Sequence, residues 1–131
     1  MRLFAFAAAL LAAPAALAGP LSSYRDQSRL VVASAPRAND PSLARQRALF
    51  AALGRQAKAR DLVLVEAVGD DPRSLAIRKA LGLGARDFEA ALVGKDGEVK
   101  LKRAAPLDAA TLLPLIDAMP MRRQEWRERG E

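Results

Sequence analysis

Residues Leu62–Val68 read LVLVEAV, and this stretch decides the fold. All of its residues except Glu66 are apolar, and valine recurs at alternate positions. A short, continuous apolar run rich in β-branched residues is typical of a strand buried on both faces, as in a parallel sheet. The chain on either side should therefore supply helices that cover both faces of that sheet.

The segment before this strand supplies the other parts of a βαβ unit. A short apolar strand is predicted at Leu30–Ser34, and a long helix is predicted from Pro41 to about Ala59. Asp40 is a good N-cap residue, and a proline suits the first helical position because its missing N–H is not needed there. Strand, helix and strand then form a unit that is expected to be right-handed.

A second helix follows LVLVEAV with the same kind of start. Asp71 is the expected cap and Pro72 the first helical residue, and Gly82 can end the helix in a left-handed conformation. Leu75 and Leu81 are predicted to point inward from this helix.

The segment after the second helix predicts a hairpin. Strands at Ala90–Val93 and Val99–Leu101 flank the sequence GKDGE, in which Asp96-Gly97 is a strong turn signal. A last helix is expected after the cap residue Asp108, with Pro114 inside it, where a proline ring clashes with the carbonyl four residues earlier. Either a separate turn precedes a helix that starts near Leu112, or the helix kinks.

The element order is therefore β-α-β-α-β-β-α. A parallel βαβ half precedes an antiparallel ββα half, which predicts an α/β, thioredoxin-like fold with a mixed central sheet flanked by helices.

The first eighteen residues have the pattern of a secretory signal. Arg2 precedes an apolar run, and Ala16-Leu17-Ala18 has the small residues of a cleavage site. We expect residues 1–18 to be a signal peptide, residues 19–131 to be a single domain, and the product to be periplasmic or secreted. An uncleaved anchor is the alternative. No later apolar segment approaches the length of a membrane span.

The composition removes several classes of chemistry. The chain has no cysteine and no histidine, which excludes thiol nucleophiles, Ser-His pairs and His/Cys zinc sites. We expect no cofactor and no metal. The formal net charge is +6, but charges of both signs are mixed and aromatic residues are few, so nucleic acid is not an expected partner.

Four segments resemble a known family. ASAPRANDPSLARQ, ARDLVLVEAVGD, ALVGKDGEVKLK and LIDAMPMRRQE are similar, in order and spacing, to the thioredoxin-like family of unknown function found in bacterial exported proteins. Related copies, called DUDES, are repeats in animal extracellular matrix proteins. GKDG is a weak signal, and IDAMPMRRQE is far more specific. The resemblance implies a thioredoxin-like fold, export and no established activity.

The chain departs from redox-active thioredoxins at the position of their dithiol. The segment APRAND, Ala35–Asp40, lies there and contains no sulfur. ARDFEA, at Ala85–Ala90, replaces the proline that usually precedes the third strand. The resemblance therefore favours the fold and speaks against disulfide exchange.

Two groups of polar residues are weak candidate sites. Arg37 and Asp40 either line a small-ligand pocket at a helix N-terminus or belong to an ordinary capped helix start. Lysines around the hairpin, among them Lys95 and Lys100, either protect an edge strand or attract an anionic surface.

The segment from Met119 onward is the strongest candidate. Pro120 can begin a short helix that ends before Gly130. Either Met119, Met121 and Trp126 pack the chain end onto the domain, or Arg122 and Arg123 present guanidinium groups to a carboxylate or phosphate beside an adaptable Met/Trp surface. Their double alanine variant is expected to fold.

We interpret the protein as a non-catalytic binding module for an envelope protein or an anionic envelope component. One alternative is an enzyme of unfamiliar type that uses carboxylate or arginine groups near Arg37 and Asp40. A further alternative is a redox partner without thiols of its own.

Overall fold

Strands β1 (Arg29–Ala35) and β2 (Leu62–Val68) form the parallel pair on which the domain is built. Their register places Arg29 opposite Leu62 and Ala35 opposite Val68. The computed structural model describes residues 19–130, so the predicted signal peptide lies outside the described residues. Strands β3 (Glu89–Val93) and β4 (Val99–Arg103) join antiparallel and give the sheet the order β2-β1-β3-β4.

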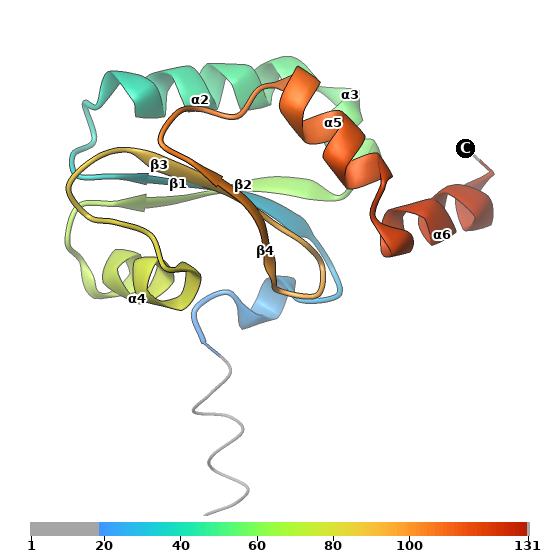
Figure 1. Cartoon of the computed structure of the whole chain (residues 1–131), viewed down its shortest axis with the longest axis horizontal. Helices are drawn as coiled ribbons and strands as arrows, with labels where there is room; N and C mark the ends of the chain where they lie inside the picture. The colour runs from blue at the N-terminus through green and yellow to red at the C-terminus, as the bar shows by residue number, and fades with distance from the viewer. Residues whose placement is uncertain (1–18, 131) are drawn as a thin grey trace, which may run out of the picture.

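Helices cover both faces of this mixed sheet, as Figure 1 shows. Alternate residues of β1 point to opposite sides. Val31, Ala33 and Ala35 join the cluster under α2 (Pro41–Leu53) and α5 (Ala109–Asp117), and Leu30 and Val32 join the cluster over α4 (Pro72–Leu81). The short 3-10 helix η1 (Ser22–Tyr24) packs its Tyr24 on the α4 side. This architecture confirms the predicted α/β class and is consistent with a thioredoxin-like fold.

The first long helix differs from the prediction of a single helix to Ala59. It ends at Leu53, and a second, short helix, α3 (Arg55–Ala59), follows. Gly54 separates the two with φ +51° and ψ −123°, a backbone conformation outside the helical region that glycine adopts without a Cβ penalty. The break changes the direction of the chain before β2.

Helix α4 begins as predicted, with Asp71 capping the N–H of Ser74 and Gly82 left-handed at its end. The prediction for Leu75 is wrong, because this residue is 48% exposed. Ile77 and Leu81 face the sheet instead. Leu75 precedes Ile77 by two positions, about 200° around a helix, which places the two on opposite faces.

The β3–β4 hairpin is confirmed, with a turn closed by the N–H of Gly97 on the carbonyl of Gly94 at 3.0 Å. Gly97 has the positive φ, at +85°, that the turn signal requires. Lys95 lies in this turn but is only 7% exposed, so its side chain does not point into solvent as a lysine in a hairpin turn usually does.

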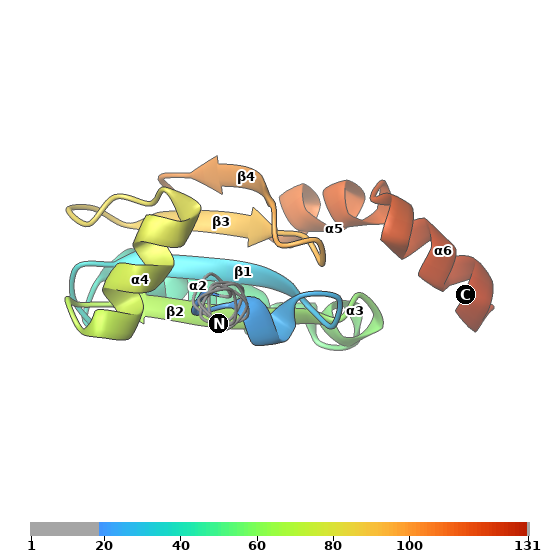
Figure 2. The ribbon, with the colours of Figure 1, turned by 90° about the horizontal axis from the view of Figure 1, so that it is seen from below.

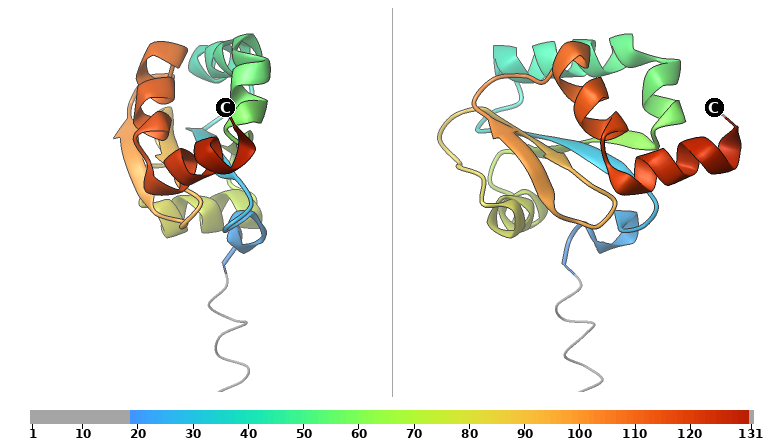
Figure 3. Two further views of the ribbon diagram at one scale, coloured as in Figure 1. Left: turned by 90° about the vertical axis from the view of Figure 1, so that its right-hand side faces the viewer. Right: turned by 45° about the vertical axis from the view of Figure 1, so that its right-hand side comes forward.

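Two helices end the chain. Helix α5 is capped by Asp108 and continues through Pro114, which contradicts the alternative of a separate turn before Leu112. Helix α6 (Pro120–Arg129) begins at the predicted proline and ends at a left-handed Gly130. Figures 2 and 3 show α6 continuing beyond α5 at one end of the molecule.

Candidate functional site

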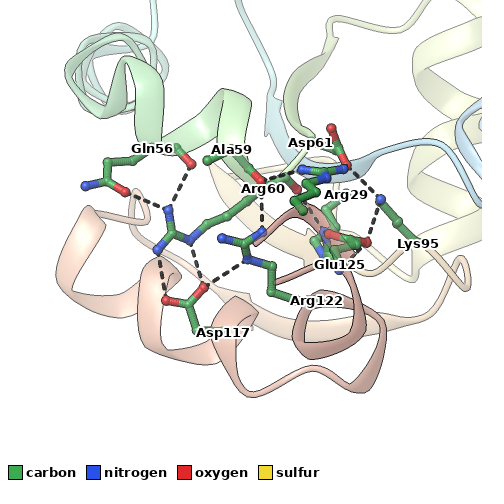
Figure 4. Close-up of polar contacts among 10 residues, drawn as sticks. Arg29, Gln56, Ala59, Arg60, Asp61, Lys95, Asp117, Arg122 and Glu125 are labelled. Atoms are coloured by element: carbon green, nitrogen blue, oxygen red, sulfur yellow. Dashed lines mark hydrogen bonds and ion pairs between the residues drawn. The ribbon is translucent and has the colours of Figure 1, made fainter. Parts of the chain in front are cut away.

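Arg29, the first residue of β1, is fully buried although it carries a charge. Its Nη1 donates to the carbonyl of Arg60 at 2.9 Å. Nη1 and Nη2 also donate to the two carboxylate oxygens of Glu125 in α6, at 3.0 and 3.1 Å (Figure 4). Such a two-bond fork is a strong, directional way for a guanidinium to hold a carboxylate. Arg29 therefore fastens the last helix to the first strand.

Lys95 approaches the same carboxylate from the hairpin turn. Its Nζ donates to Oε2 of Glu125 at 2.7 Å and to Oδ2 of Asp61 at 2.8 Å. Glu125 thus accepts hydrogen bonds from two buried cations, one at the start of β1 and the other in the turn between β3 and β4. We call Arg29 and Lys95 together the basic cradle.

Asp61 connects the basic cradle to the end of α6. It lies between α3 and β2 with φ +49°, a left-handed conformation that aspartate tolerates better than most residues. Arg129 donates from Nη2 to Oδ2 of Asp61 at 2.7 Å and from Nη1 to the carbonyl of Ala59 at 2.9 Å. The joint between α3 and β2 therefore holds both Lys95 and the last turn of α6.

A second group of ion pairs surrounds Asp117, the last residue of α5. Arg60 donates from Nε and Nη2 to the two carboxylate oxygens of Asp117 at 2.9 and 2.8 Å. Nε of Arg122 lies 3.4 Å from Oδ1 of the same carboxylate. Arg122 also donates to the carbonyl of Ala59 at 3.0 Å, and its guanidinium lies 5.5 Å from the centre of the Trp126 ring. Arg122 is 3% exposed and so belongs to the interior of the joint.

The cations around Asp61, Asp117 and Glu125 favour the ionised form of each carboxylate. Burial alone raises the pKa of Glu125, but hydrogen bonds and charge from Arg29 and Lys95 outweigh it and lower that pKa. The pKa of Asp61 and that of Asp117 are lowered in the same way, against burial, by the cations that they hold. All three are anionic at neutral pH.

The stripe of α6 that faces the domain is charged. Arg122, Glu125 and Arg129 are spaced by three and four positions, which places them on one side of a helix. Neither hydrophobic cluster of the described chain contains a residue of α6, although Met119 just before it packs against the cluster under α2 and α5. Ion pairs and hydrogen bonds, more than apolar burial, hold α6 in place.

The other side of α6 presents two arginines. Arg123 and Arg127 are exposed, and within residues 19–130 their side chains make no hydrogen bond or ion pair. Trp126 lies at a neighbouring helical position and is 41% exposed. We call Arg123, Trp126 and Arg127 the outer face of α6.

The structure brings the predicted residues of the C-terminal segment together but separates them from the predicted corner. Arg37 is exposed in the loop after β1, and Oδ1 of Asp40 caps the first long helix by accepting from the N–H of Ser42 at 2.8 Å. Because β1 begins at Arg29 and ends at Ala35, this corner lies at the opposite end of the sheet from α6.

The corner itself is built around a different cation. Arg78 of α4 is buried and donates to Oγ of Ser34 at 2.8 Å and to the carbonyls of Ala35 and Ala67 at 3.0 and 3.1 Å. These bonds tie the carboxyl ends of the two parallel strands to α4. The guanidinium therefore has a structural use at this corner.

Sequence reasoning missed Arg29, Asp61, Lys95 and Glu125 as a group. A charged residue before an apolar strand was a visible signal at Arg29. No pattern connects it to Glu125, however, because 96 positions separate the two.

Two further observations bear on the chemistry of residues 19–130. No group of three acidic, histidine or cysteine side chains in this range is placed to hold a metal ion. No helix in the same range is long and apolar enough to cross a membrane.

Residues 20–125 match the model of a protein family described as a domain of unknown function, DUF4174. The match includes the basic cradle, Asp61, Asp117 and Glu125, which is its last residue. No curated protein matches the chain.

Proposed function

The chain belongs to the DUF4174 family of domains of unknown function, and we propose that it is an exported, non-catalytic binding module that recognises an acidic protein of the cell envelope through the outer face of α6. The signal pattern of residues 1–18 supports export. The proposal rests chiefly on one observation, an exposed tryptophan beside two exposed arginines that have no side-chain partner within residues 19–130.

The chemistry of the outer face suits recognition of carboxylates. Guanidinium groups bind carboxylates with two parallel hydrogen bonds, and Arg123 and Arg127 are four positions apart on one helix face. Trp126 adds apolar area beside them, and tryptophan and arginine are enriched among residues that dominate binding energy.

The carboxylates of the site favour binding over acid–base catalysis. Asp61, Asp117 and Glu125 each hold cations, and a lowered pKa keeps each of them ionised near neutral pH. A general acid needs a pKa near the operating pH. Asp40, in the other candidate position, is already used as a helix cap.

Photo-cross-linking in the native envelope tests this proposal. A photoreactive residue replaces the exposed Gln124 of α6 in one variant and the exposed Ala76 of α4 in a matched control. The proposal predicts one product, formed from position 124 alone, whose partner has an acidic surface and whose yield falls as salt rises. Equal products from both positions, or a partner without an acidic surface, would overturn it.

A further inference from the structure

The basic cradle is held in position by parts of the domain other than α6. The carbonyl of Arg60 accepts from Nη1 of Arg29 at 2.9 Å, and Asp61 accepts from Nζ of Lys95 at 2.8 Å. Both acceptors lie at the joint of α3 and β2, as Figure 4 shows. The two cations therefore keep an anchor when Glu125 leaves, which is the preorganisation that a binding site requires.

Glu125 satisfies the cradle only in part. It uses Nη1 and Nη2 of Arg29, whereas Nε of the same guanidinium is buried without a partner in the described part of the chain. A buried donor that makes no hydrogen bond is costly, by about 1–3 kcal/mol in proteins. The resting arrangement thus leaves one donor that a differently placed carboxylate can use.

The attachment of α6 is of a kind that a competing anion can replace. No residue of α6 belongs to a hydrophobic cluster of the described chain, and only Ala118 and Met119 connect α6 to α5. A small hollow adjoins Arg29 and Lys95, and its other lining residues are Asp96, Lys100, Met119, Pro120 and Met121. Releasing α6 therefore costs ion pairs more than apolar burial.

We propose that the basic cradle is a carboxylate-binding site whose resting occupant is Glu125 of the chain itself, and that an acidic segment of a partner protein displaces α6 from it. The outer face of α6 is a different surface. Failure of the cradle proposal leaves the proposed recognition through Arg123 and Arg127 standing, and the reverse also holds.

The test uses the full chain with Glu125→Gln, which keeps the shape of the side chain and removes its charge. The probe is a synthetic peptide with the sequence of residues 119–129, whose glutamate at the position of Glu125 is the carboxylate that the cradle accepts. Binding is followed by the amide NMR signals of Arg29, Asp61 and Lys95. The peptide should bind Glu125→Gln at least about tenfold more tightly than wild type, because the internal competitor is weakened.

Two controls isolate the carboxylate. A peptide with glutamine in place of the glutamate that corresponds to Glu125 should not bind. Glu128→Gln in the chain should behave as wild type, because Glu128 is exposed. Adding Lys95→Gln to the Glu125→Gln chain should abolish binding. Equal binding of both peptides, or no binding of either, would overturn the proposal.

A second measurement applies if Glu125→Gln fails to fold. Wild type is then titrated with the same peptide into the millimolar range, where a free ligand competes with a tethered one. The amide signals of Arg129 and Gly130 should shift as α6 is released. If they stay fixed while the peptide is in excess, α6 is a permanent part of the domain and the proposal is wrong.

Discussion

Arg29 and Glu125 are 96 positions apart in the chain and are joined by two parallel hydrogen bonds of 3.0 and 3.1 Å. This pair attaches a helix of which no residue belongs to a hydrophobic cluster of the described chain. The first strand and the last helix are thereby coupled through charge, and the stability of α6 becomes sensitive to charge, pH and salt.

Removing the charge of Glu125 should loosen α6. Glu125→Gln is expected to lower the free energy of unfolding by about 1.5–3 kcal/mol, because hydrogen bonds to charged groups contribute about that much. Urea unfolding measures the loss, and the fluorescence of Trp126, the single tryptophan of the chain, reports whether α6 stays docked. Glu128→Gln on the same helix is the matched control and should change neither signal. An unchanged stability in Glu125→Gln would mean that the pair is not what holds the helix.

Acid should loosen α6 in the same way. The lowered pKa of Glu125 and that of Asp61 mean that the folded domain binds fewer protons than the unfolded chain. Their contribution to stability is therefore complete above the ordinary carboxylate pKa values of 4.5 and 3.8, and it is lost as pH falls through the lowered folded values. The groups that face them are Arg29, Lys95 and Arg129.

Urea midpoints measured between about pH 7 and about pH 3 check this dependence. The wild-type midpoint should fall across the acid part of that range, and Glu125→Gln should lose less because one of the linked groups is gone. An identical pH profile for the two proteins would contradict the assignment of the effect to Glu125.

Arg122 and Arg123 should behave differently although they are adjacent. Arg122 is buried and bound to Asp117 and the carbonyl of Ala59, so Arg122→Ala should cost about 1–3 kcal/mol of unfolding free energy. Arg123 is exposed, so Arg123→Ala should stay within about 0.5 kcal/mol of wild type. Thermal unfolding of the two single variants compares them. The structure thus gives a reason to expect that the double alanine variant is destabilised, whereas the sequence alone suggested that it folds normally.

Substitutions of Asp40, at the opposite end of the sheet from α6, test whether this residue has a structural or a catalytic role. As a helix cap, it should tolerate Asp40→Asn, because asparagine caps equally well, while Asp40→Ala should cost about 1 kcal/mol. Unfolding measurements on both variants test the cap. If Asp40→Asn abolished turnover of an envelope substrate without lowering stability, the result would support the alternative that the protein is an enzyme.

Much of the fold could be predicted because local patterns carry it. The apolar run of β2, the Asp-Pro helix starts and the Asp96-Gly97 turn each act through neighbouring residues. The exceptions are local as well. The break at Gly54 depends on a single positive φ inside a helical pattern, and Leu75 lies on the exposed side of its helix.

The candidate site could be predicted only in part. Pro120 and Gly130 indicate where α6 begins and ends. Its arginines and tryptophan are residue types common in binding sites, so the sequence alone indicates them as candidates. The division of these residues into an inner stripe and an outer face depends on where the helix docks. That docking is decided by Arg29, Asp61 and Lys95, which are distant from α6 in the chain. No local pattern singles out Arg29 or Asp61, and Lys95 was predicted only as one of the lysines around the hairpin.

Charge reversal on the outer face of α6 tests the central claim most directly. The dissociation constant of the cross-linked envelope partner is measured for the double variant Arg123→Glu with Arg127→Glu. The control is Arg45→Glu with Arg55→Glu, which reverses two exposed arginines on α2 and α3. The account predicts that the first double variant binds at least about tenfold more weakly than wild type, since like charges across an interface repel, while the second binds as wild type. Equal affinities for the two double variants would contradict it.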